Sequence, residues 1–137
     1  MDGGLIQVRF DHSNKFDLSF TAYNGGTYEV RTRPWSRYVP TYIQPQAVDE
    51  SLRQIDTLGL QWFHDRTIEE HRNETGTNFP EIINLRVRVE WDDYEIYQGL
   101  TLQMSYSYKN SESRNSVFTT VFQPNGTLLS RVLANIP

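Results

Sequence analysis

The stretch Leu100-Thr101-Leu102-Gln103-Met104-Ser105-Tyr106-Ser107-Tyr108 alternates between apolar or aromatic side chains and small polar ones. Successive side chains of a β-strand point to opposite faces, so this segment predicts a strand with one dry and one wet face. The same two-residue period recurs elsewhere in the chain, at residues 5–10, 16–22, 27–33, 85–91, 94–98, 116–122 and 127–134. The chain is therefore predicted to form a sheet with one covered face and one open face.

Turn residues separate these segments and indicate antiparallel pairing. Asn24-Gly25-Gly26 and Pro124-Asn125-Gly126 are typical of tight hairpins, because asparagine and glycine tolerate positive φ. Asp92-Asp93 is predicted to be a further turn. The strands before residue 34 most simply form a meander.

One region, residues 46–73, has the helical period instead. Val48, Leu52, Ile55, Gly59 and Trp62 fall on one stripe, and the preceding proline suits a first helical turn. Glycine is unfavourable inside a helix, so Gly59 marks either a break into two helices or a close approach to the sheet.

Together these patterns predict an α+β fold in a single domain over residues 1–137. We expect a mostly antiparallel, strongly curled sheet of about seven strands with one long amphipathic helix on one face, in the order βββ-α-ββββ. One helix cannot cover so many strands, which lie about 4.8 Å apart. The aromatic, proline-containing residues 34–45 or a second chain are expected to cover the rest.

Composition restricts the classes of function. The formal net charge is −4 and there is no cysteine, which excludes disulfides, zinc–thiolate sites and thiol catalysis. An acidic chain lacks the basic field that non-specific nucleic-acid binding needs. The sequence has no apolar run of membrane-spanning length and no signal-like N-terminus, so we expect a cytoplasmic protein without a membrane segment.

Arginines gather on the wet positions of two predicted strands, as Arg31, Arg33, Arg86 and Arg88. If those strands were neighbours, the four guanidinium groups would share a face and could bind phosphate or carboxylate groups. The interpretation that the sequence favours is an ordinary cross-strand ion-pair ladder with Glu29 and Glu90.

Aromatic residues in the 34–45 segment form a second candidate site. Trp35, Tyr38 and Tyr42, with Arg33 and Arg37 beside them, are of the types enriched at recognition surfaces. They could equally complete the core over an uncovered part of the sheet.

No residue pattern indicates catalysis, a metal site or a cofactor. His64 and His71 lie seven residues apart on a helix, about 10 Å along its axis, too far to share one metal ion. We interpret residues 64–71 as a solvated helical end, and Asp92-Asp93 as turn chemistry.

Two classes of function remain. The first is a small soluble binding or inhibitor module that acts on a protein partner, as an immunity protein or an anti-defence inhibitor does. The alternative is a pocket protein for a nucleotide or phosphorylated metabolite, with an enzymatic role left open, its pocket lined by Tyr94, Tyr97, Tyr106 and Tyr108. Homo-oligomer formation is compatible with both, because an open sheet face or edge invites a second copy.

Overall fold

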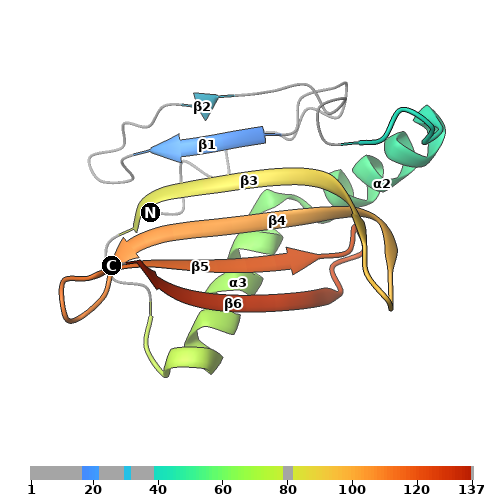
Figure 1. The fold of residues 1–137 in the computed structure, drawn as a ribbon. Coiled ribbons are helices and arrows are strands. Elements are labelled where there is room, and N and C mark those ends of the chain that lie inside the picture. Colours follow the sequence, from blue (N-terminus) through green and yellow to red (C-terminus); the bar gives the residue numbers. More distant parts are fainter. Residues whose placement is uncertain (1–16, 22–29, 32–38, 79–81, 137) are drawn as a thin grey trace.

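The structure is a computed structural model that describes residues 17–21, 30–31, 39–78 and 82–136. The described strands are β1 (Asp17–Thr21), β2 (Val30–Arg31), β3 (Ile82–Asp93), β4 (Gln98–Lys109), β5 (Asn115–Phe122) and β6 (Leu128–Ile136). Two helices, α2 (Pro45–Leu58) and α3 (Leu60–Thr75), connect β2 to β3. Figure 1 shows both helices on one side of the sheet, with α3 running across the strands.

The described strands form one antiparallel sheet in the order β2-β1-β3-β4-β5-β6. The four long strands, β3 to β6, follow one another as hairpins, and β1 pairs with the outer side of β3. The predicted α+β class with an antiparallel sheet is confirmed. The predicted count of seven strands, their order and the strong curl are not matched. The strand predicted at residues 5–10 lies outside the described residues.

The turn between β3 and β4 comes later than predicted. Asp92 and Asp93 belong to β3, and the chain reverses at residues 94–97, where Tyr94 N–H donates to the carbonyl of Tyr97 at 2.8 Å. The Asp92 carboxylate accepts hydrogen bonds from Thr101 and Gln103 on β4, so cross-strand contacts extend the ladder past the expected turn. The predicted strand at residues 94–98 is therefore mostly turn. The hairpin at Asn125-Gly126 is where the sequence predicts it.

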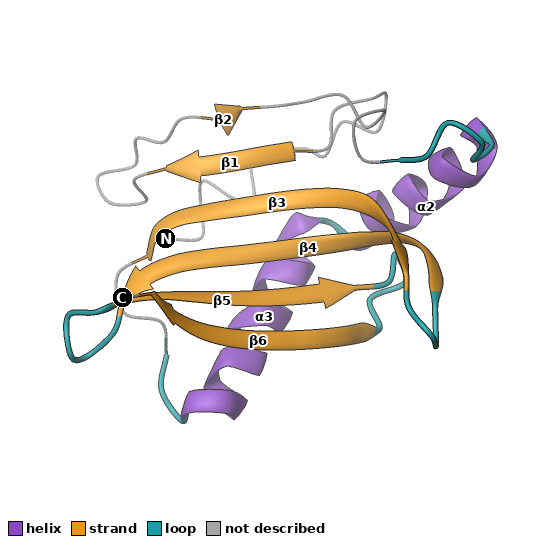
Figure 2. Ribbon diagram, in the orientation of Figure 1, coloured by secondary structure: helices purple, strands orange, loops and turns teal. Residues whose placement is uncertain are grey.

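The single long helix is also a wrong prediction, because the chain breaks at Gly59. This residue has φ 88° and ψ 151°, a backbone conformation that is essentially restricted to glycine. Its N–H still donates to the carbonyl of Ile55 at 2.8 Å, which ends α2 cleanly. The break lets α3 leave in a new direction and cross the sheet, as Figure 2 shows.

The core lies between the helices and the dry face of the sheet. The apolar positions of the opening stretch are buried as predicted, although Thr101, a predicted wet position, is buried as well. Val48, Leu52 and Ile55 of the predicted helical stripe are buried, whereas Trp62 is 38% exposed. Val39 is buried and Ile43 packs against the core, so the described end of the 34–45 segment contributes cover. The core cluster includes Val48, Leu52, Ile55, Phe63, Leu85, Val87, Val89, Leu102, Met104, Tyr106 and Phe122.

Candidate functional site

The sheet has one face that packs against α2 and α3 and one face that these helices do not cover. The second face is the first candidate site, and we call it the open face. Strand register aligns one row of residues across all six described strands, and the members of this row on β3 to β6 lie on the open face. In order from β2 to β6 the row is Arg31, Ser19, Arg86, Ser105, Thr119 and Val132. In the next row Asp17, Arg88, Gln103, Val121 and Ser130 are in register. The described helices lie on the other side.

The predicted arginine set is only partly brought together. Arg86 and Arg88 share the open face of β3, two residues apart. The strand that carries Arg31 does not neighbour β3, because β1 lies between them. Arg31 is thus two strand spacings from Arg86, about 10 Å, across Ser19.

The aromatic candidate site is represented by one described residue. Tyr42 lies just before α2 and is 76% exposed, so it is not part of the core. The other residues predicted for these sites lie outside the described residues: Arg33, Trp35, Arg37 and Tyr38.

Charge changes sign along β3 on the open face. Beyond the arginines lies Glu90, whose carboxylate accepts a hydrogen bond of 2.5 Å from Gln103. Burial is the largest effect on the pKa of Glu90 and raises it, and the negative charge of Asp92 raises it further. The hydrogen bond from Gln103 and the positive charge of Arg86 lower it. The interaction with Arg86 supports the ion-pair interpretation for this part of the arginine set. At the same end Tyr94 reaches from the β3–β4 turn to hydrogen bond with Ser130 on β6.

On β5 and β6, two and three strands from the arginines, the open face becomes apolar. Val117 and Ala134 face each other on β5 and β6, and Val132, 57% exposed, is the partner of Thr119. Exposed apolar side chains and arginines on one surface are typical of protein contact surfaces. Arg86, Arg88, Gln103 and Ser105 line a hollow of about 60 Å³, far below the several hundred Å³ of small-molecule sites.

The second candidate site is the buried polar face of α3. His64 and His71 are both buried, so the prediction of a solvated helical end is wrong. His64 hydrogen bonds to the Tyr106 hydroxyl, and Thr67 lies 2.8 Å from the Thr120 hydroxyl. The described helix therefore meets the sheet through paired polar groups as well as through apolar packing.

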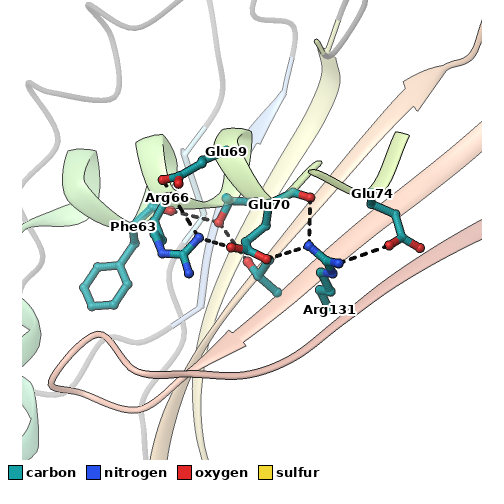
Figure 3. A network of polar contacts seen from close by, with 8 residues as sticks. Phe63, Arg66, Glu69, Glu70, Glu74 and Arg131 are labelled. Atoms are coloured by element: carbon teal, nitrogen blue, oxygen red, sulfur yellow. Dashed lines mark hydrogen bonds and ion pairs between the residues drawn. The ribbon is translucent and has the colours of Figure 1, made fainter. Parts of the chain in front are cut away.

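A buried ion cluster continues this polar face and is drawn in Figure 3. Glu70 lies between Arg66 of the same helix and Arg131 of β6, with its side chain 8% exposed. Arg131 contacts Glu70 at 2.7 Å and Glu74 at 3.5 Å. Two guanidinium groups on one buried carboxylate connect α3 to β6, the last strand of the sheet.

His71 and Tyr108 form the last polar pair along α3. Nδ1 of His71 lies 3.2 Å from the Thr77 carbonyl, and Nε2 lies 2.9 Å from the Tyr108 hydroxyl. A carbonyl only accepts, so these contacts assign the proton to Nδ1 and make Nε2 the acceptor of the Tyr108 proton. Burial lowers the pKa of His71, partly offset by the Thr77 hydrogen bond, and burial raises the pKa of Tyr108, partly offset by Ser116.

The four tyrosines that were predicted to line one pocket do not do so. Tyr106 is fully buried in the core, whereas Tyr94 and Tyr97 belong to the turn between β3 and β4. Tyr108 instead lines a cavity with His71 at the opposite end of β4. A signal for this arrangement exists in the sequence. Two histidines seven apart share a helix face, and two tyrosines two apart share a strand face.

The described residues contain no group of three or more His, Cys, Asp or Glu side chains placed to hold a metal ion. Neither described helix is long and apolar enough to cross a membrane. The chain matches no protein-family model, no curated protein and no solved structure.

Proposed function

We propose that the protein is a small binding module that acts by protein–protein contact through the open face. The observation that carries this proposal is the arginine pair of β3 together with the exposed Val132, three strands away on β6, on a sheet face that the described helices leave uncovered. Such a module needs no reacting group of its own. The activity that best suits such a module is inhibition, in which the open face covers a functional site of the partner.

The chemistry of the open face favours a partner with an acidic, partly apolar surface. Arginine forks bind carboxylates in a bidentate way, and arginine is enriched in interface cores. The whole chain is acidic, with a formal charge of −4, so the arginine pair is a local exception rather than part of a general basic field. Local complementarity of this kind contributes specificity and faster association.

The alternative, a pocket for a nucleotide or phosphorylated metabolite at the arginines, has weaker support. The hollow beside Arg86 and Arg88 measures about 60 Å³ and cannot enclose a nucleotide. A flat partner surface fits these side chains better than a small ligand does.

Affinity capture from the native source with matched charge reversals tests the proposal. The test variant is Arg86→Glu with Arg88→Glu. The control is Arg53→Glu with Arg114→Glu, which changes the net charge equally at two exposed arginines away from the open face. We expect wild type and control to retain the same partner and the test variant to lose it. Identical capture by all three proteins would contradict the proposal, and recovery of the chain itself would identify a homo-oligomer.

A further inference from the structure

A cavity of about 470 Å³ lies between the C-terminal end of α3 and the ends of β4, β5 and β6. It is on the helix side of the sheet, so it is separate from the open face and from the proposed protein contact. His71 and Tyr108 form its buried part, and exposed Asn78 and Asn135 lie where it meets solvent. The volume is within the range of small-molecule sites.

The described residues that line this cavity carry no charged side chain, and most of them are polar. Side-chain amides come from Asn78, Asn110 and Asn135, and hydroxyls come from Ser116 and Tyr108 among others. Leu133 supplies apolar surface. No carboxylate, lysine or arginine belongs to the lining in the described part of the chain. Arg72, outside it, donates to Asn78 at 2.9 Å.

Hydrogen bonds among the lining groups hold them in place. Ser116 donates to Oδ1 of Asn135 at 2.8 Å and lies 3.3 Å from the amide nitrogen of Asn110. Oδ1 of Asn110 in turn accepts from the backbone N–H groups of Glu112 and Arg114. The amides are thus oriented before any ligand arrives, which lowers the entropy cost of binding.

The buried end of the cavity also holds no charge near neutral pH. His71 accepts the Tyr108 proton at Nε2 and donates from Nδ1 to the Thr77 carbonyl, an arrangement that satisfies the neutral imidazole. Both groups are kept in their neutral forms by burial. Phosphate or carboxylate ligands would find no opposite charge here, whereas hydroxyl groups would find donors and acceptors together.

We propose that this cavity binds a neutral, polyhydroxylated small molecule, with one or two sugar rings as its chemical class. Hydroxyl groups of such a ligand pair with the asparagine amides and the serine and tyrosine hydroxyls. The C–H face of a sugar ring packs against Leu133 and the ring pair of His71 and Tyr108, whose centroids are 5.3 Å apart in an edge-to-face arrangement.

Titration of the isotopically labelled protein with neutral sugars, followed by NMR, tests this proposal. The probes are glucose, galactose, mannose, N-acetylglucosamine, maltose, lactose and trehalose, with glucose 6-phosphate as the charged counterpart of glucose. We expect at least one neutral sugar to give saturable shifts in the side-chain amides of Asn78, Asn110 and Asn135. The phosphorylated sugar should bind no more tightly than glucose.

Two substitutions at the solvent end make the test specific. Asn78→Ala and Asn135→Ala change exposed residues and should each weaken binding about three- to tenfold, the effect of one lost hydrogen bond. Asn73→Ala, an exposed asparagine of α3 outside the lining, should leave the affinity unchanged. The proposal is overturned if no neutral sugar shifts these amides, if Asn135→Ala binds as wild type does, or if glucose 6-phosphate binds more tightly than glucose.

Discussion

His71 shows how a side chain acquires its role from what the fold places opposite it. In the sequence it is a polar residue near a helix end, yet it is buried and paired with Tyr108. The pKa of His71 is lowered below 6.5 by burial. As the pH falls, the unfolded chain therefore binds a proton at this position before the folded protein does. The stability contributed by the neutral residue is present above about pH 6.5 and is lost below it.

Substitution of His71 should remove this pH dependence. The difference in free energy of unfolding between wild type and His71→Gln should shrink as the pH is lowered from about 7.5 to about 5.5. Burial raises the pKa of Glu90, so this residue contributes to the pH dependence of stability with the opposite sign. Its contribution is the same in both proteins and cancels in the difference between them. Urea denaturation at several pH values measures the difference. A difference that stays constant with pH would contradict the assignment.

Glu70 is a second buried residue whose substitution should change the stability of the folded protein. Glu70→Gln leaves Arg66 and Arg131, about one-third exposed, facing a neutral amide. Breaking a fully buried pair costs about 3–5 kcal/mol, and partial exposure of the arginines reduces this, so we expect a loss of about 2 kcal/mol. The control is Glu69→Gln, since Glu69 is 61% exposed and should lose less than about 0.5 kcal/mol. Equal stabilities by urea denaturation would show that the cluster is not stabilising.

At the scale of elements, the sequence predicts what depends on neighbours along the chain. Strands β4, β5 and β6 follow from their two-residue alternation, and the Asn125-Gly126 hairpin follows from its turn residues. The insertion of β1 between β2 and β3 depends on contacts between residues far apart in sequence. Alternation alone cannot choose among such pairings, so the arginine-bearing strands could not be placed.

The polar face of α3 escaped prediction for a different reason. Hydrophobic periodicity treats histidine, threonine and glutamate as outward-facing residues, because each is costly to bury alone. Partners from the sheet remove that cost for His64, Thr67 and Glu70. Which residues become partners depends on the folded chain. In the sequence, only the seven-residue spacing of His64 and His71 and the two-residue spacing of Tyr106 and Tyr108 indicate the pairing.

Gly59 is the residue that turns one predicted helix into two elements. Its φ of 88° and ψ of 151° are costly for any side chain, whereas Gly76, at φ 75° and ψ 3°, ends α3 in the left-handed region that asparagine tolerates. We therefore expect Gly59→Asn to lose about 2 kcal/mol of stability and Gly76→Asn less than about 1 kcal/mol. Thermal or urea unfolding ranks the two. A smaller loss of stability for Gly59→Asn than for Gly76→Asn would contradict the helix break at Gly59.

For the molecule as a whole, the two sides of the sheet differ in composition and in cover. One side carries the helices, the core and the paired polar groups that hold α3 in place. The other side carries arginines, small polar residues and valines in rows set by strand register, and among them Arg86 and Val132 are exposed whereas Val121 is buried. The opening alternation thus predicts the two faces except at Thr101, a predicted wet position that is fully buried. The alternation pattern carries no information on the partner that we propose for the open face.

The most direct measurement of partner binding through the open face is a cysteine footprint, which is feasible because the chain has no cysteine of its own. Val132→Cys places a thiol on the open face, and Gln54→Cys places one on the exposed side of α2. Each purified variant is alkylated alone and after mixing with extract of the native source. We predict that the extract slows alkylation severalfold at position 132 and leaves position 54 unchanged. Equal rates at position 132 with and without extract would contradict binding through the open face.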